Sequence, residues 1–231
     1  GSSRLLDGVS FLAVPGYTGM VSINYTGRSS GGATFSGVVE IQVYAAGGPP
    51  TIDGYLPFRD ISSSAYYFDA VKWAVNTGIT SGTTATTFSP DAACTRAQMV
   101  TFLWRAAGSP APRSSVNPFR DINSGAYYYQ AVVWAVEQGI TSGTSSTTFS
   151  PDAIITRGQT VMFLYRNAGS PASGTGSAFD DVKIGDYYSP AVRWAVANGI
   201  TSGTSATTFS PSASCTRAQI VTFLYPTFAG W

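Results

Sequence analysis

Residues 73–104 read WAVNTGITSGTTATTFSPDAACTRAQMVTFLW, and the same stretch returns with few changes at residues 134–165 and 194–225. The three tryptophans that open it lie 61 and 60 residues apart, and the phenylalanines and arginines inside it keep that spacing. Such a fixed period is typical of tandem copies of one supersecondary unit. We therefore assign most of the chain to three copies at residues 58–108, 119–169 and 179–225, joined by short links rich in Pro, Ser and Gly.

The first half of each copy predicts a short helix that leads into a loop. An apolar run around Trp73 gives the helix, and the glycine after its last turn suits the left-handed C′ position. The three glycines are Gly78, Gly139 and Gly199. In the third copy, Ser189–Pro190 predicts an N-cap followed by proline at the first helical position. The loop then reaches Phe88, which we expect to insert into the core.

The second half predicts a longer helix that starts with a capping box. Thr95–Arg96–Ala97–Gln98 places a threonine at the N-cap and a glutamine at N3, so that each side chain binds the other residue's backbone amide. The same box returns once in each later copy. Pro226 stands where the other copies have Arg105 and Arg166, and a proline there predicts that the third helix ends early.

Together, the three copies predict a mainly α fold. One helix pair of this size cannot cover its own apolar face, whereas three pairs around a shared axis can. We therefore expect three helix–loop–helix repeats in one compact pseudo-threefold unit, not three separate beads.

The first fifty residues follow a different pattern, in which apolar and polar residues alternate. Residues 20–25 and 35–44 predict two strands, residues 27–32 a turn between them, and residues 9–14 a third strand. The hairpin resembles the closing hairpin of a bacterial immunoglobulin-like domain. It is either the tail of a longer β-domain or a small hairpin that docks on the helical unit. Gly47–Gly48–Pro49–Pro50 predicts a linker, so we place the β segment at residues 1–50 and the three repeats at residues 51–110, 111–172 and 173–231.

Composition excludes several classes of function. The net charge is +1, so the chain has no basic field for nucleic acid or an anionic membrane. No apolar run approaches the roughly 20 residues that span a bilayer. The sequence contains no histidine, which removes histidine-based nucleophiles, general bases and metal ligands. We expect no catalytic residues, no metal site and no cofactor.

Two reactive residue types have simple structural interpretations. Cys94 and Cys215 align with Ile155, which predicts buried free thiols instead of a disulfide. One aspartate also occurs near the start of each copy, so a threefold unit should hold the three carboxylates apart, and we expect them to stabilise local turns. These are Asp60, Asp121 and Asp181.

Segments of the first copy carry a resemblance to a known family: Phe58–Arg59–Asp60–Ile61, Ala70–Val71–Lys72–Trp73–Ala74–Val75, Gly78–Ile79–Thr80–Ser81–Gly82, Thr87–Phe88–Ser89–Pro90 and Cys94–Thr95–Arg96–Ala97–Gln98. Repeated three times in order, they resemble the S-layer homology family. The resemblance implies three lobes around a central three-helix bundle, with grooves that hold secondary cell wall polymers, often bearing pyruvate ketals. The chain departs from the family in its Thr-rich loop, which lacks the usual Tyr, Asp, second Gly and basic residue, and in a Gln at the place of the signature Glu.

The resemblance assigns glycan binding to one arginine in each copy. The residues are Arg96, Arg157 and Arg217. On physical grounds, an arginine at a helix start beside free backbone amides suits a carboxylate. An ion pair with the aspartate of the repeat is an equal alternative. As surface charges, these arginines should contribute little to stability.

Aromatic residues and glycines complete the candidate site. The tyrosine before each first helix is a candidate groove wall, whereas Trp73, Trp134 and Trp194 belong to dense apolar helices and predict core positions. We name nine ligand-binding candidates: Arg96, Arg157, Arg217, Tyr66, Tyr127, Tyr187, Gly82, Gly143 and Gly203.

These features predict a non-catalytic module that anchors a protein to the bacterial cell wall by binding an acidic polysaccharide, with avidity from up to three grooves on one polymer. We expect it to be extracellular and monomeric, a pseudotrimer within one chain. The alternative function is protein–protein assembly of a surface layer, with loops that no longer bind sugar. A third hypothesis makes the chain the C-terminal part of a secreted enzyme whose chemistry lies upstream.

Overall fold

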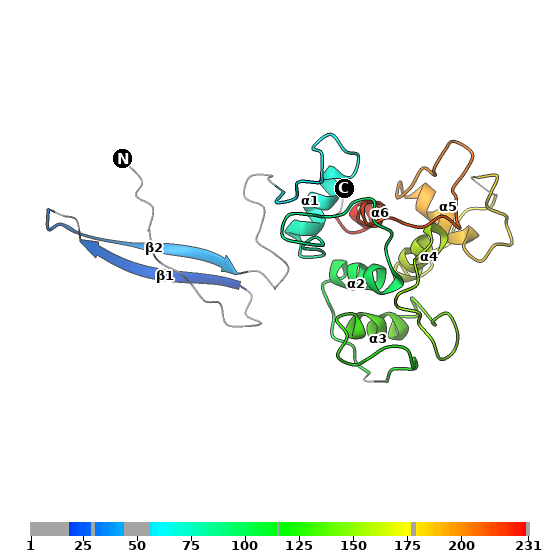
Figure 1. The fold of residues 1–231 in the computed structure, drawn as a ribbon, viewed down its shortest axis with the longest axis horizontal. Coiled ribbons are helices and arrows are strands. Elements are labelled where there is room, and N and C mark those ends of the chain that lie inside the picture. Colours follow the sequence, from blue (N-terminus) through cyan, green and yellow to red (C-terminus); the bar gives the residue numbers. More distant parts are fainter. Residues whose placement is uncertain (1–18, 29–30, 44–55, 115, 177–178, 230–231) are drawn as a thin grey trace.

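The computed structural model describes residues 19–28, 31–43, 56–114, 116–176 and 179–229. Six helices and one pair of strands form its regular structure within these ranges (Figure 1). The strands are β1, Gly19–Arg28, and β2, Thr34–Val43. The helices are α1, Phe68–Asn76; α2, Arg96–Ala106; α3, Tyr129–Glu137; α4, Arg157–Asn167; α5, Ser189–Ala197; and α6, Arg217–Phe228. None of these six helices is long and apolar enough to cross a membrane.

The second helix of each copy, α2, α4 or α6, begins with the predicted capping box. In α2, the amide of Gln98 donates to the hydroxyl of Thr95 at 3.2 Å, and the amide of Thr95 donates back to Oε1 of Gln98 at 3.0 Å. The other two helices repeat both bonds. The box satisfies two of the amides that a helix start leaves free, so the prediction is confirmed and each helix start is fixed locally.

The first helix of each copy ends as predicted but begins differently. A glycine with φ between +66° and +74° follows each of α1, α3 and α5, and glycine adopts this left-handed conformation freely. Ser189 is the first residue of α5 and not its N-cap, which is Tyr188. The Ser189 hydroxyl instead accepts a hydrogen bond from Nη1 of Arg193 at 2.7 Å. The predicted cap is wrong by one residue because this buried serine binds a side chain from the next turn.

The proline in α6 does not end the helix early, as the sequence predicted. With 12 residues, α6 is longer than α2 and α4, which have 11 each. Pro226 lies in the last turn, where it removes only one backbone hydrogen bond. The ladder continues beyond it, since the amide of Ala229 donates to the carbonyl of Tyr225 at 2.8 Å. The prediction of an early end is therefore wrong, because the backbone keeps its helical hydrogen bonding past the proline.

Each first helix packs chiefly on the second helix of a different copy. Helix α1 contacts α6, α3 contacts α2, and α5 contacts α4, while α2, α4 and α6 also contact one another in the middle (Figure 1). The unit that repeats in the sequence is therefore not the unit that packs. The contact between α1 and α6 joins the beginning of the helical part to its end, so the three copies follow one another in cyclic order. The predicted mainly α fold with packed helices is confirmed.

Three backbone hydrogen bonds join the copies at the centre of this cycle. The amide of Cys94 donates to the carbonyl of Cys215 at 2.9 Å, that of Cys215 to Ile155 at 3.0 Å, and that of Ile155 to Cys94 at 2.9 Å. All three residues are fully buried. A buried amide or carbonyl without a partner is costly, so each copy satisfies groups that the other two would otherwise leave unpaired.

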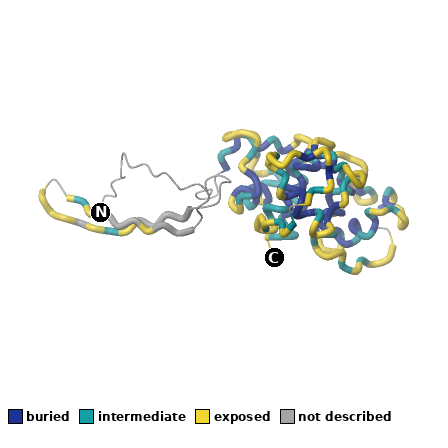
Figure 2. The backbone as a smooth tube through the Cα atoms, turned by 90° about the horizontal axis from the view of Figure 1, so that it is seen from below, coloured by how far each residue is buried: buried dark blue, intermediate teal, exposed yellow. Residues whose placement is uncertain are grey.

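The aromatic residues that the sequence assigned to the core are buried, except Trp73. Figure 2 shows the buried residues concentrated inside the helical part. Trp134 and Trp194 are 5% and 8% exposed, whereas Trp73 is partly buried and packs against the ring of Tyr225 at a centroid distance of 5.6 Å. The loop phenylalanine of each copy is fully buried: Phe88, Phe149 and Phe209.

The described part of the first fifty residues is an antiparallel hairpin. Strand β1 pairs with β2 from Gly19 opposite Val43 to Arg28 opposite Thr34. The two predicted strands are confirmed. The predicted third strand at residues 9–14 and the linker at residues 47–50 lie outside the described residues.

The cyclic packing predicts that the three copies unfold together. We expect one transition in urea, with the same midpoint by far-ultraviolet circular dichroism and by tryptophan fluorescence. Ile155→Asp should destabilise the whole helical unit, since it buries an unpaired carboxylate where the copies meet. Separate transitions for the three copies, or a variant that loses only one copy, would contradict this expectation.

The two cysteines generate a prediction about reactivity. Both are buried and free, and burial raises the pKa of Cys94 to about 12 and that of Cys215 to about 11. An unfolded chain has thiols with a pKa of about 8.5, so the unfolded state ionises first and the free energy of unfolding should fall as the pH rises from about 8.5 towards 12. At pH 8 we expect no thiol to react with Ellman's reagent in the native protein and two to react after denaturation. Rapid reaction of the native protein would show that these thiols are accessible.

Candidate functional site

The predicted arginines stand at the first position of the three central helices, and the backbone amides beside them are already engaged. The amide of Arg96 donates to the carbonyl of Ala153 at 2.9 Å, and that of Ala97 to Pro151 at 3.0 Å. The capping Thr95 takes the third amide. The same bonds recur in cyclic order at the other two helices. The expected role of free helix-start amides in anion binding is therefore wrong, because these amides hold the copies together.

The arginine side chains are buried, contrary to the expectation of surface charges. Arg96, Arg157 and Arg217 are each 4% exposed. Each Nε donates to a phenylalanine carbonyl of the next copy at 2.8 or 2.9 Å, and each guanidinium carbon lies 4.8 or 4.9 Å from the centre of the same ring. The phenylalanines are Phe149, Phe209 and Phe88, respectively. Loss of an arginine should therefore cost stability, because a buried donor and a ring contact are lost with it.

The aspartate of each copy supports the loop that the arginine contacts. Asp60 accepts hydrogen bonds from the amides of Phe88, at 2.9 Å, and Ser89, at 2.7 Å. Ser89 has a φ of +59°, which is uncommon outside glycine. Asp121 and Asp181 make the equivalent bonds in their own copies. The predicted turn role is confirmed. Within the described residues, the arginines meet carbonyls and rings instead of these carboxylates, so the alternative of an ion pair is wrong.

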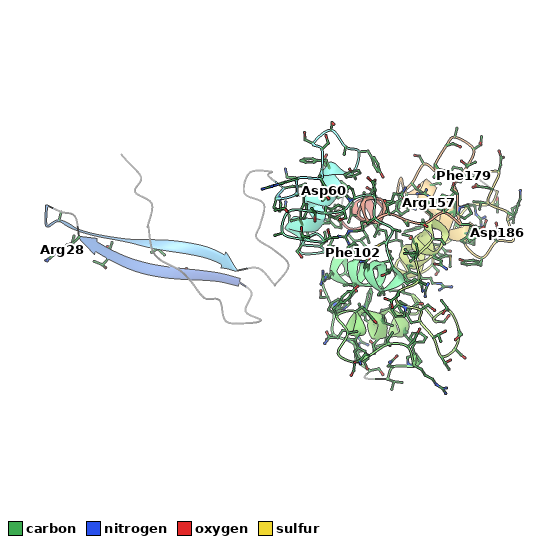
Figure 3. The ribbon with its side chains drawn as sticks, viewed as in Figure 1. Arg28, Asp60, Phe102, Arg157, Phe179 and Asp186 are labelled. Atoms are coloured by element: carbon green, nitrogen blue, oxygen red, sulfur yellow. The ribbon has the colours of Figure 1, made fainter. Side chains whose placement is uncertain are left out.

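A groove around Arg157, the Arg157 groove, draws on all three copies. It is lined by Arg157 from the second copy, Tyr66 from the first and the loop residues 201–204 of the third, and its volume is about 710 Å³. Tyr66 is 71% exposed. Arg157 lies inside the helical unit, near the contact of α4 and α6 (Figure 3). The candidates Arg157, Tyr66 and Gly203 therefore come together, although the sequence separates them widely. One wall of the groove is the face of α6 that carries Gln219, Thr222 and Phe223.

A second groove, the Arg96 groove, repeats this arrangement with the copies exchanged. Arg96 of the first copy meets Tyr187 of the third and the loop residues 141–144 of the second, around a volume of about 290 Å³. The candidates Arg96, Tyr187 and Gly143 are therefore brought together as well. The wall of this groove is the face of α4 that carries Gln159, Met162, Phe163 and Arg166.

Hydrogen bonds to Thr80 bring Arg217 and Gly82 of the third set of candidates together in the same way. Nη2 of Arg217 lies 3.4 Å from the hydroxyl of Thr80, which also accepts a hydrogen bond from the amide of Gly82 at 3.2 Å. The guanidinium carbon is 5.3 Å from the ring centre of Phe102. Burial lowers the pKa of Arg217, and Tyr127 is one of the nearby groups that oppose this shift. Arg217, Gly82 and Tyr127 thus also belong to three different copies.

Burial determines the electrostatics of the three arginines. It lowers the pKa of each guanidinium group, the direction expected when a cation loses contact with water. Arginine nevertheless remains protonated in proteins. Each arginine is therefore a poorly hydrated positive charge, and an anion beside it would be attracted more strongly than at an open surface.

The three candidate glycines are required at their positions for steric reasons. Gly143 has a φ of +88°, and a Cβ atom added to it would lie 2.4 Å from the carbonyl oxygen of Thr148 and 2.5 Å from Cε1 of Phe119. Gly82 and Gly203 meet equivalent atoms in their own copies. The loop can therefore turn over the phenylalanine ring only where the side chain is absent.

Hydroxyl groups hold the Thr-rich loop beside each glycine. Thr144 Oγ1 lies 2.7 Å from Oγ of Ser150 and 3.1 Å from Oγ1 of Thr148, and Oγ of Ser145 lies 2.6 Å from Oγ1 of Thr148. The other two copies repeat this network. The loop thus has a defined shape although it lacks the Tyr, Asp and basic residue of the family pattern.

Sequence reasoning missed the helix face that completes each groove. In the Arg96 groove this face carries positions 159, 162, 163 and 166 of α4, which is the spacing of one helical stripe. The stripe begins at the capping-box glutamine and ends at the arginine that Pro226 replaces in the third copy. The spacing of these residues is visible in the sequence, but from the sequence alone Pro226 predicts only an early helix end.

Comparisons with known proteins agree with the repeat. The model of the S-layer homology domain matches residues 57–100, 118–161 and 178–221. Similar proteins include the surface-layer 125 kDa protein of Lysinibacillus sphaericus, 32% identical over 158 residues, and an endoglucanase of Bacillus sp. (strain KSM-635), 31% identical over 169 residues. A cell surface protein of Thermoanaerobacter kivui is 28% identical over 117 residues. The matches cover 67%, 71% and 49% of this chain but only 13%, 18% and 15% of those proteins.

The glycine geometry can be tested by substitution. Gly143→Ala should lower the free energy of unfolding by about 2 kcal/mol or more, because it forces both a strained φ and a steric clash. Gly174→Ala is the matched control, since an added Cβ there meets nothing within 4 Å, and its effect should stay within about 0.5 kcal/mol. Equal stability of the two variants in urea denaturation would show that the loop tolerates a side chain at residue 143.

Proposed function

Because the chain belongs to the S-layer homology family, a family of cell-wall anchoring modules, we propose that it attaches a surface protein to the wall by binding an acidic polysaccharide in the grooves between its copies. Membership of the family locates the chain outside the cell, at the cell wall or in the S-layer. The three copies form an anchoring module and not a catalytic domain.

The observation that supports the acidic specificity is that the Arg157 and Arg96 grooves each contain a buried arginine that contacts no carboxylate among the described residues. The guanidinium of Arg157 contacts a backbone carbonyl and two aromatic rings, none of which bears a negative charge. Asp181 attracts this cation without contacting it among the described residues, and a buried cation without a contacting anion is unfavourable. A carboxylate on a sugar would supply charge-assisted hydrogen bonds that water supplies poorly at this depth.

Exposed tyrosines supply the second element of a sugar site. Tyr66 and Tyr187 line the two grooves and are 71% and 61% exposed. A tyrosine ring offers an apolar face for a sugar ring and a hydroxyl at its edge. The arginine would thus select the charge, and the tyrosine would support the sugar that carries it.

The repetition of the site suits a polymeric ligand. A polysaccharide that repeats its acidic unit can occupy more than one groove of the same module, and the second contact is then intramolecular. We propose that a monomer binds in this way. Weak binding in each groove would be sufficient for stable attachment to the wall.

The names of the relatives fit an attachment function. They are a surface-layer protein, a cell surface protein and an endoglucanase, and this chain spans less than a fifth of each. A module that only attaches can serve proteins of different activities. We propose that this chain does the same for a larger surface or secreted protein.

Binding to isolated walls tests the proposal. The protein should sediment with sacculi of its source bacterium and remain in solution with sacculi from which the secondary polysaccharide has been extracted. Purified polysaccharide should compete, whereas the same polymer with its carboxyl groups reduced to alcohols should not. Equal competition by the reduced polymer would contradict acidic recognition, and no sedimentation with intact sacculi would favour assembly between surface proteins instead.

Residue substitutions assign the binding to the grooves. The combined change of Tyr66, Tyr127 and Tyr187 to Ala should weaken sedimentation while leaving the melting temperature nearly unchanged, because these side chains are exposed. Val116→Ser is the control, as Val116 is 71% exposed, like Tyr66, but does not line the Arg157 or Arg96 groove. A tyrosine variant that sediments as well as the parent would remove these residues from the site.

A further inference from the structure

The second helices of the three copies differ near their C-terminal ends. In two copies an arginine of the last turn folds back onto the loop of its own copy: Nη1 of Arg105 donates to the carbonyl of Ile79 at 3.0 Å, and Nη1 of Arg166 to Ile140 at 3.1 Å. Arg166 thereby lines the Arg96 groove. The third copy has Pro226 at this place, so no such side chain crosses the Arg157 groove to reach Ile200.

A second difference lies one turn earlier on the same helix face. The Arg96 groove carries Met162, and the Arg157 groove carries the smaller Thr222 at the equivalent position. The two volumes follow this difference, at about 290 Å³ and about 710 Å³. Ligand sites typically measure about 300–1,000 Å³. The volume of the Arg157 groove lies well within that range, whereas the volume of the Arg96 groove lies just below it.

The arginines themselves are also not equivalent. Nη2 of Arg157 is buried and has no hydrogen-bond partner among the described residues. The equivalent Nη2 of Arg217 lies 3.4 Å from the hydroxyl of Thr80, which is 2% exposed. The corresponding Thr201 of the Arg157 groove is more exposed and lines the cavity. A buried guanidinium nitrogen without an acceptor is costly, so the positive charge of Arg157 is less well satisfied inside the protein than that of Arg217.

We propose that the Arg157 groove is the principal polysaccharide site of this chain. One anionic group of the polymer lies against the Arg157 guanidinium where it lines the groove, and the neighbouring sugar occupies the space that Met162 and Arg166 fill in the Arg96 groove. Pro226 and Thr222 are then the specificity-determining residues, because their small size admits that sugar. This inference rests on the proposed function and goes beyond it by ranking the grooves.

Two arginine variants provide a matched comparison. Arg157→Ala and Arg96→Ala remove the same internal contacts, since both side chains are 4% exposed and both bind a phenylalanine carbonyl, at 2.9 and 2.8 Å. Their losses of thermal stability should therefore be alike. In calorimetric titration of the full chain with purified wall polysaccharide, Arg157→Ala should weaken binding about tenfold or more, the expected effect of losing one charge-assisted contact. Arg96→Ala should weaken it by less than about threefold.

A variant that fills part of the Arg157 groove, the filling variant, tests whether the ligand needs that space and leaves Arg157 in place. Pro226→Arg combined with Thr222→Met gives α6 the same side chains that α4 has at these two positions, Arg166 and Met162. The melting temperature should stay or rise, since arginine suits a helix better than proline. Binding should fall about tenfold or more. The control is Val116→Arg, which adds the same charge at an exposed position outside the Arg157 and Arg96 grooves and should leave binding unchanged within about threefold.

The outcomes separate this inference from the proposed function. Equal losses for Arg157→Ala and Arg96→Ala, or full binding by the filling variant, would overturn the ranking of the grooves and leave wall attachment in place. No binding of the polysaccharide by the parent protein would overturn the proposed function, and the ranking with it.

Discussion

The helical unit depends on the backbone hydrogen bonds that each copy makes with the next. Cys94, Ile155 and Cys215 form a closed cycle of three such bonds, and the first amides of α2, α4 and α6 donate to loop carbonyls of the following copy. The residues that donate these bonds are buried, so water cannot readily replace a missing partner. Removing any copy would therefore leave unsatisfied donors or acceptors in both of the others. This constraint explains why the three copies fold together as a cycle.

The same constraint creates the grooves. The loop that follows each first helix is held from two sides, by the aspartate of its own copy at the amides of Phe88 and Ser89 and by an arginine of another copy at the carbonyl of Phe88. The arginine must therefore lie between copies, with Nε and its ring contact committed to the fold. Only the remaining guanidinium nitrogens can face a ligand. A residue that stabilises the interface between copies thus also provides the charge of the proposed binding site.

Sequence differences between the copies give the grooves different volumes and lining residues. Pro226 costs α6 one backbone bond, but its more visible effect is that no arginine spans the Arg157 groove. Since the repeated framework is preserved, a single substitution in one copy changes the shape of one groove and leaves the others intact. Tandem copies in a cycle therefore allow binding sites to diverge without loss of the common core.

The sequence by itself determined the features that depend on residues within a few positions of one another. These include the capping boxes, the left-handed glycines, the buried loop phenylalanines, the hairpin strands and the family. Tertiary structure decided which residues of different copies meet, as with Arg157, Tyr66 and Gly203 in one groove. It also decided that the arginines are buried, that the helix-start amides are engaged, and that Ser189 binds Arg193 instead of capping α5. The physical reason is that caps and turns are set by local hydrogen bonds, whereas a repeat period is equally compatible with several ways of pairing the copies and says nothing about which neighbour each side chain reaches.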